Sequence, residues 1–146
     1  MFNTDKNYLK YWRVVRFWVK AKHNLSTPEL EMLLFLYSEE YFNKTKFKEF
    51  EQLMSWDINR FDNLLKDGWI KVWRKKSGKY TTLYELSYKG KRVVATIYKK
   101  LSGEEIAESP GLNPLFRSDA TYMQKVYRNS IKEMNEFIKQ QRYLSQ

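Results

Sequence analysis

The chain has 146 residues, of which 42% are hydrophobic and 17% aromatic, a composition that excludes a disordered protein and fits one compact domain. It contains no cysteine, which excludes a disulfide framework and a thiolate metal site. Most of the formal net charge of +10 comes from residues 71–100, which hold ten basic residues against Glu85 alone. Such a block is typical of a phosphate-binding surface, and the alternative is a solvated face that keeps the protein soluble.

The first residues, MFNTDKNYLK, are charged where the apolar run of a secretory signal peptide would begin. No apolar run approaches the roughly 20 residues that a membrane-spanning helix needs. We therefore expect a cytoplasmic protein without a membrane partner.

A first helix is predicted from Tyr8 to about Ala21, where apolar residues repeat at helical spacing over an unusually broad face. One core cannot easily cover so broad a face on a terminal helix, so part of it is expected to pack against a second subunit. A position on a membrane surface is the less favoured alternative, because basic residues interrupt the aromatic ones on every side.

The sequence LSTPELEMLL predicts the start of a second helix. Ser26 and Glu29 match a capping box, and Pro28 suits the first turn. The residues that follow are apolar on nearly every side, as expected of a central helix that several others contact. This helix is expected to be a scaffold, not a site.

Two short amphipathic helices joined by the turn MSWD (54–57) predict a helix-turn-helix. Gly68 is placed to end the second helix in a left-handed C-cap. The inward-facing residues are expected to be Phe47, Phe50, Leu53 and Met54 from the first helix, and Ile58, Phe61, Leu64 and Leu65 from the second.

The sequences WIKVW and YTTLYELS predict two strands around RKKSGK, with the turn at Ser77-Gly78, and this hairpin is expected to be a wing. Ser87 can cap a further helix that ends near Gly103. Residues 104–118 contain two prolines and are expected to be a loop, the one plausible linker. The helix that Ser87 caps is expected to bury Val93 or Val94, Ile97, Tyr98 and Leu101.

A long final helix is predicted from about Asp119, with apolar residues at helical spacing as far as Ile138. Like the first helix, it is terminal and heavily apolar. The two apolar ends predict a homodimer, because a domain of this size cannot hide both faces alone.

This order of elements resembles the MarR family of winged-helix transcription regulators. The best local matches are LSTPELEMLL, LLKDGWI and LSYKG (86–90), similar to the family's entry into its second helix, the end of its recognition helix and the end of its wing. The resemblance covers most of the chain. It implies a mainly α fold with a small β-hairpin (α+β), in which a winged helix-turn-helix core is flanked by N- and C-terminal dimerisation helices.

The resemblance also implies a domain layout and a function. One domain would span residues 1–146, with dimerisation helices at 1–24 and 119–146 and the helix-turn-helix, wing and following helix at 45–102. Family members are homodimers whose recognition helices enter successive major grooves of double-stranded DNA and whose wings touch the minor groove. Many relatives also bind a small-molecule effector between the terminal helices and the DNA-binding part.

The regulator is the favoured function, and two features of the sequence leave an alternative open. The wing lacks the usual Asp-x-Arg pair, and residues 57–67 hold three Asp against Arg60 and Lys66, a poor charge for a helix on phosphates. The alternative is a winged-helix module for protein–protein interaction or structural assembly, for example phage-encoded, without sequence-specific DNA binding.

The candidate site residues form three groups. The wing residues expected to contact phosphates are Arg74, Lys75, Lys76 and Lys79. The recognition-helix residues expected to meet base edges are Asn59, Arg60, Asn63 and Lys66. The residues expected at the dimer interface are Tyr8, Trp12, Val15, Val19, Val126, Met134, Phe137 and Ile138.

Enzymatic chemistry is not expected. His23 is the only histidine and is more typical of a helix end than of a catalytic base or a metal ligand. The five glycines lie at separate turns, so no phosphate-binding loop is present. We expect no catalytic residue, no metal and no cofactor.

Overall fold

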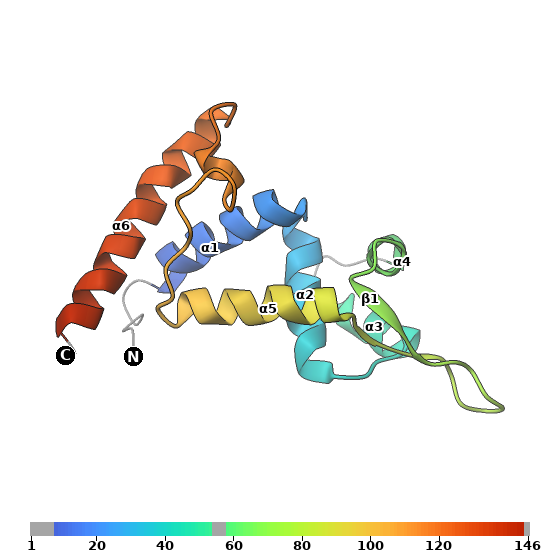
Figure 1. The fold of residues 1–146 in the computed structure, drawn as a ribbon. Coiled ribbons are helices and arrows are strands. Elements are labelled where there is room, and N and C mark those ends of the chain that lie inside the picture. Colours follow the sequence, from blue (N-terminus) through green and yellow to red (C-terminus); the bar gives the residue numbers. More distant parts are fainter. Residues whose placement is uncertain (1–7, 54–57, 145–146) are drawn as a thin grey trace. The chain divides into compact units, whose positions relative to one another are not determined.

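The structure is a computed structural model that describes residues 8–53 and 58–144 (Figure 1). These residues form a mainly helical fold with one two-stranded antiparallel sheet, as the α+β class predicts. The chain divides into two compact units. The first unit comprises Met1–Leu25 and Thr96–Gln146, and the second comprises Ser26–Ala95.

The second unit begins with α2 (Thr27–Glu39), whose predicted capping box is confirmed. The Ser26 backbone N–H donates to Glu29 Oε1 at 3.0 Å, and the Glu29 N–H donates to Ser26 Oγ at 3.3 Å. Leu30, Met32, Leu33 and Leu36 are all buried, so α2 is the central scaffold helix that its composition predicts.

Helices α3 (Lys44–Phe50) and α4 (Ile58–Lys66) follow α2. The predicted turn at 54–57 lies outside the described residues, as do the side chains of Met54 and Ile58. The prediction for Leu53 was wrong: it follows the end of α3 and is 74% exposed. Phe47, Phe61 and Leu64 are fully buried and Phe50 nearly so, while Leu65 is half-buried.

Aromatic rings form the core of the second unit. The Phe61 ring makes edge contacts with Phe47, Phe42 and Tyr84, at centroid distances of 4.9, 6.2 and 5.0 Å. Such edge-to-face contacts stabilise beyond the area that they bury. The core therefore ties both short helices to the sheet.

The end of α4 fixes the start of the hairpin. Gly68 has φ +81°, its N–H donates to Leu65 O at 3.2 Å, and the Trp69 N–H donates to Leu64 O at 2.9 Å. These two bonds form a Schellman motif, which confirms the predicted left-handed C-cap at Gly68.

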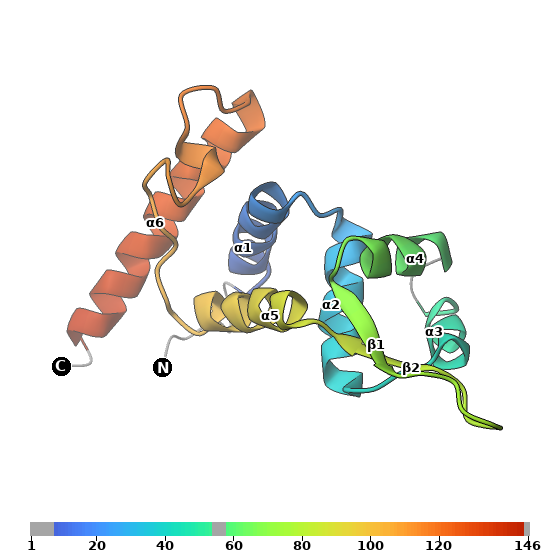
Figure 2. The ribbon, with the colours of Figure 1, turned by 45° about the vertical axis from the view of Figure 1, so that its right-hand side comes forward.

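The hairpin consists of β1 (Ile70–Arg74) and β2 (Leu83–Leu86), which pair antiparallel with Ile70 opposite Leu86 and Val72 opposite Tyr84. Phe42 adds one further rung to this sheet. It is an isolated antiparallel bridge between Phe42 and Tyr84, formed by two backbone hydrogen bonds of 3.0 and 2.8 Å. In both ribbon views the distal half of the hairpin extends beyond the helices of its unit (Figures 1 and 2).

Helix α5 (Tyr88–Leu101) begins where the sequence predicts, since the Gly90 N–H donates to Ser87 Oγ at 3.1 Å. It ends at Leu101, and Gly103, which has φ +109°, follows two residues later. Val93, Val94 and Ile97 are buried as predicted and Leu101 is half-buried. The prediction that Tyr98 is buried was wrong, because half of this side chain is exposed.

In the first unit, α1 (Tyr8–His23) packs against α6 (Tyr122–Leu144) and the short 3-10 helix η1 (Pro114–Phe116). The rings of Phe17 and Tyr127 stack at 3.9 Å. Thr121 caps α6, so the helix starts slightly later than the predicted Asp119. Much of the apolar face that was expected to need a second subunit is thus covered within the chain.

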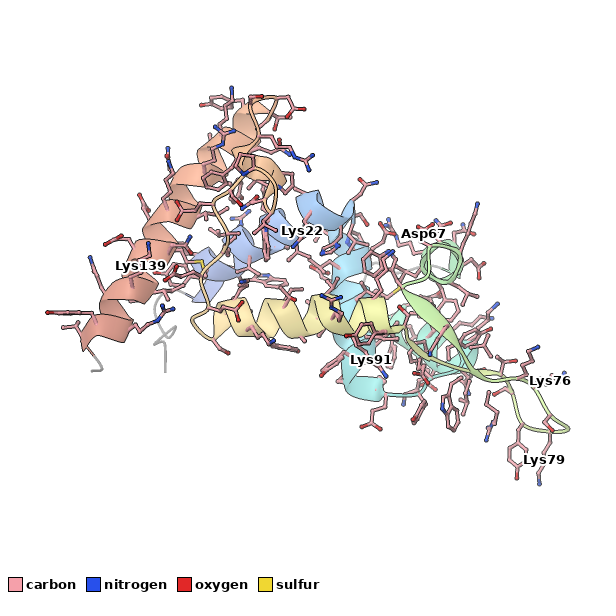
Figure 3. All side chains as sticks on the ribbon, viewed as in Figure 1. Lys22, Asp67, Lys76, Lys79, Lys91 and Lys139 are labelled. Carbon is pink, nitrogen blue, oxygen red and sulfur yellow. The ribbon has the colours of Figure 1, made fainter. Side chains whose placement is uncertain are left out.

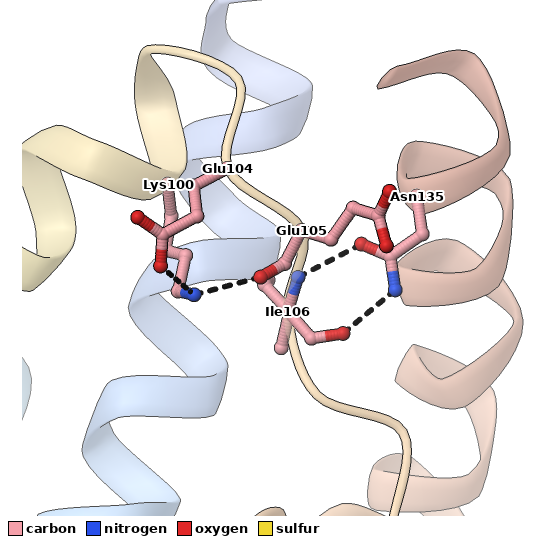
Figure 4. A network of polar contacts seen from close by, with 5 residues as sticks. All are labelled: Lys100, Glu104, Glu105, Ile106 and Asn135. Carbon is pink, nitrogen blue, oxygen red and sulfur yellow. Dashed lines mark hydrogen bonds and ion pairs between the residues drawn. The ribbon is translucent and has the colours of Figure 1, made fainter. Parts of the chain in front are cut away.

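The segment between α5 and α6 is not the linker that its prolines suggested. It lies within the first unit, and Ile106, Asn113 and Leu115 are buried. The Asn135 side chain from α6 accepts from the Ile106 N–H at 2.9 Å and donates to Ile106 O at 2.7 Å, as a neighbouring strand would (Figure 4). These bonds satisfy a buried stretch of backbone that has no strand partner.

The same segment is attached to the end of α5. Lys100 Nζ, almost buried, donates to Glu104 Oε1 at 2.6 Å and to Glu105 O at 2.7 Å (Figure 4). The hydrogen bond from Lys100 is the main cause that lowers the pKa of Glu104 below its ordinary value. The chain after α5 is therefore held by a charged pair and a backbone contact.

None of the helices in the described part of the chain combines the length and the apolar character that crossing a membrane requires.

Candidate nucleic-acid interface

The hairpin tip is a tight turn that carries exposed cations. Ser77 and Tyr80 exchange two backbone hydrogen bonds, of 3.1 and 3.0 Å, around Gly78 and Lys79. Gly78 has φ +57° and Lys79 has no positive φ, the pattern of a type II′ turn. The turn therefore centres one residue later than the predicted Ser77-Gly78.

Within the described ranges, 8–53 and 58–144, the lysines of the tip have no acidic partner. Residues 71–84 contain five basic residues and no acidic one. In the part of the chain that the structure describes, no carboxylate lies at ion-pair distance from Lys75, Lys76 or Lys79. Lys76 and Lys79 project from the tip (Figure 3). The structure thus brings the four predicted wing residues together on one exposed loop.

The single acid of the basic block lies at the base of the hairpin, not at the tip. Glu85 is 9% exposed, lies opposite Lys71 at the base of the hairpin, and forms an ion pair with Lys91 at 3.4 Å. A charge that is buried and paired in this way contributes little negative potential at the tip.

Exposed aromatic side chains lie among the hairpin cations, a feature that the sequence reasoning missed. The Tyr41 ring lies 4.2 Å from Trp73, and the Arg74 guanidinium lies 5.8 Å from Trp73 and 5.4 Å from Tyr80. We call the three aromatic residues Tyr41, Trp73 and Tyr80 the aromatic row. The pattern WIKVWR does not by itself indicate this row, because the sequence does not show that the strand leaves the core after Ile70.

On α4, the predicted base-reading residues divide into two kinds. Asn59, Asn63 and Lys66 are exposed, whereas Arg60 is half-buried with its Nε inside the protein. Arg60 is therefore held against its own unit and is less available than the other three.

The acidic residues of the same helix are in part compensated. Asp62 lies 3.8 Å from Lys44 Nζ of α3, an ion pair that joins two segments and that the sequence reasoning did not include. Asp57 lies outside the described residues. The unfavourable charge counted from the sequence is thus smaller on the folded surface.

The residues predicted at the dimer interface fall into a partly exposed group and a buried group. Trp12 and Phe137 are half-buried, Val126 is 41% exposed, and the side chain of Tyr8 lies outside the described residues. The remaining four are buried within the chain, so their side chains are core and not a free surface: Val15, Val19, Met134 and Ile138.

A cavity of about 490 Å³ lies beside the base of the hairpin, within the second unit. Its polar groups come from Tyr37, Glu40, Tyr41 and Lys91, and its apolar wall from Leu36 and Leu86. Among the described residues, no three His, Asp or Glu side chains come together as metal ligands.

No protein-family model, no curated protein and no solved structure matches the chain significantly. The resemblance to the MarR family stays a prediction from the sequence.

Proposed function

We propose that the protein is a winged helix-turn-helix regulator of the MarR type that binds double-stranded DNA. In this proposal α3 and α4 form the helix-turn-helix, and β1 and β2 form the wing. The order α2, α3, α4, β1 and β2 supports it, together with the single rung that Phe42 adds to the sheet. The observation that carries the proposal is the hairpin tip, where four cations are exposed and, among the residues that the structure describes, none of its lysines has an acidic partner.

The wing would contact phosphates, and α4 would contribute limited base contacts. Arg74, Lys75, Lys76 and Lys79 supply the positive charge that sequence-independent affinity requires. Asn59 and Asn63 suit adenine and Lys66 suits guanine in the major groove. The small number of such residues favours a protein whose affinity comes mostly from the DNA backbone.

The test is a variant in which Lys75, Lys76 and Lys79 are changed to Ala. Folding should be nearly unchanged, because these side chains are exposed. Affinity for duplex DNA should fall on every sequence alike, and the slope of log affinity against log salt should flatten by about 0.9 for each phosphate that the protein no longer neutralises. Fluorescence anisotropy at several salt concentrations measures both quantities.

The matched control changes Lys125, Lys132 and Lys139 of α6 to Ala, which removes the same charge from another exposed surface. This control should retain most of the affinity and the salt slope. If the wing variant binds duplex DNA with unchanged affinity and slope, the wing does not contact phosphates. The interaction-module alternative would then be the better account.

A further inference from the structure

We infer that the aromatic row on the hairpin is a stacking site for unpaired DNA bases, so that the protein prefers duplex DNA that adjoins a single strand. This inference rests on the proposed function, because it assumes that the hairpin meets DNA. It adds unpaired bases beside a duplex as the class of ligand, which phosphate contacts alone do not distinguish from an intact duplex.

The row is exposed although its members are large and aromatic. Trp73 is 47% exposed, Tyr41 47% and Tyr80 58%, and the neighbouring Val72 is 41% exposed. Of the five residues of β1, only Ile70 is buried. A group of exposed apolar side chains at one place marks an interaction surface, whereas single exposed ones do not.

The backbone holds Tyr41 in a constrained position beside Trp73. Glu40 has φ +61° and ψ −71°, and the Tyr41 N–H donates to Glu39 O at 2.7 Å, which together define a γ-turn. The next residue, Phe42, is fixed by its rung with Tyr84. A non-glycine residue in this conformation is strained, and such strain concentrates at functional sites.

The charges around the row favour a polyanion. The Arg74 guanidinium lies 5.8 Å from the Trp73 ring and 5.4 Å from the Tyr80 ring, and Lys79 Nζ lies 5.9 Å from the Tyr80 ring. Nucleic acids combine negative phosphates with flat aromatic bases, and stacking of bases on aromatic side chains is sequence-tolerant. An apolar protein partner would match the rings but not the five cations of residues 71–84.

The partner must offer base faces. In a duplex the faces are covered by neighbouring base pairs, and only the edges are open in the grooves. A strand end or a single-stranded tail exposes faces to Trp73 and Tyr80 while its phosphates stay within reach of the tip lysines. The row therefore fits unpaired bases better than an intact duplex.

The experiment compares three fluorescent DNAs at one salt concentration. The first is a blunt duplex, the second is the same duplex with an oligothymidine tail, and the third carries a tail of abasic residues that keeps the phosphates and removes the bases. Wild-type protein should bind the oligothymidine-tailed duplex most tightly. Trp73→Ala should lose about tenfold in affinity for that DNA and little for the other two.

Trp73→Phe should retain most of the preference for the oligothymidine tail, because it keeps an aromatic face. Tyr143→Ala removes an exposed tyrosine from the last turns of α6 and should change nothing. The lysine variant of the wing should weaken binding to all three DNAs. Thermal unfolding of each variant checks that the fold is retained.

The outcomes separate the inference from the proposed function. Equal binding of the oligothymidine and abasic tails, or a preference that survives Trp73→Ala, would overturn the stacking site and leave duplex binding intact. No binding to any of the three DNAs would overturn the proposed function and the inference with it. If the protein binds the oligothymidine-tailed duplex and neither of the other two DNAs, the stacking site is supported and a duplex-reading regulator is contradicted.

Discussion

Two glycines are required near the hairpin for different physical reasons. Gly68 adopts φ +81° in open space, so only its backbone conformation excludes a side chain. Gly90 has no such φ, but a Cβ at this position would lie 2.6 Å from the carbonyl oxygen of Trp69. The first turn of α5 therefore packs directly on the backbone that leads into β1.

Alanine at the two positions should have unequal costs. Gly68→Ala should lower the free energy of unfolding by roughly 1–2 kcal/mol through the left-handed conformation. Gly90→Ala should cost about 1–3 kcal/mol, because backbone must move to relieve the overlap. Urea unfolding measures both. Gly111→Ala is the control, since this glycine has no positive φ and no atom near the position of a Cβ. A Gly90→Ala protein as stable as the wild type would contradict the close contact.

At the scale of elements, the segment between α5 and α6 is held by side chains in place of a sheet. Asn135 supplies the backbone partners of Ile106, and the Arg128 guanidinium donates to the carbonyl oxygens of Leu115 and Arg117. A buried backbone group without a partner costs about 1–3 kcal/mol. These contacts explain how a proline-containing segment can be part of a core.

Glu104 should make the attachment of this segment dependent on pH. Its pKa is lowered in the folded chain, so its contribution is present above the ordinary pKa and is lost as pH falls through the lowered value. Glu104→Gln should thus reduce the melting temperature at neutral pH, by at most the equivalent of about 1 kcal/mol because the carboxylate is half-exposed.

The melting temperatures of wild type and Glu104→Gln, measured from neutral to acidic pH, check this expectation. The difference should close as the solution becomes acidic, because protonated Glu104 resembles glutamine. Glu49→Gln, an exposed carboxylate of the other unit, is the control and should show no comparable gap. A constant difference across the whole range would contradict the pairing with Lys100.

At the scale of the whole molecule, self-association remains a prediction. The buried positions of Val15, Val19, Met134 and Ile138 remove half of the predicted interface residues from consideration. Exposed apolar side chains are nevertheless present on the first turns of α6, where Tyr122 is 80%, Met123 51% and Val126 41% exposed. We propose that this surface, not the buried face, contacts a second copy of the chain.

The double variant Met123→Glu, Val126→Glu should therefore convert a dimer into a folded monomer, since both side chains are exposed and their replacement leaves the core intact. Sedimentation at micromolar concentration measures the mass, and circular dichroism checks the helix content. Lys132→Glu, on the same helix, is the control and should stay dimeric. A wild-type protein that sediments as a monomer would contradict the proposal.

Part of the candidate site could be predicted because it depends on neighbours along the chain. The four cations of the tip were identified from charge and turn residues alone, and the structure exposes all of them. The aromatic row could not be identified in this way, because Tyr41 and Trp73 are distant in sequence and meet only after Phe42 joins the sheet. The same holds for the ion pair of Lys44 with Asp62.

By itself the sequence determined three helix ends, the start of α2, the end of α4 and the start of α5. The capping box at Ser26, the Schellman motif at Gly68 and the cap at Ser87 all involve groups within a few residues of one another, so their energies are decided locally. The tertiary structure decided the burial of side chains that need a partner from another segment. Leu53, Tyr98 and Trp73 are exposed while Val15 and Met134 are covered within the chain, because burial also depends on what another segment places opposite each side chain, and periodicity along the chain does not say which segment that is.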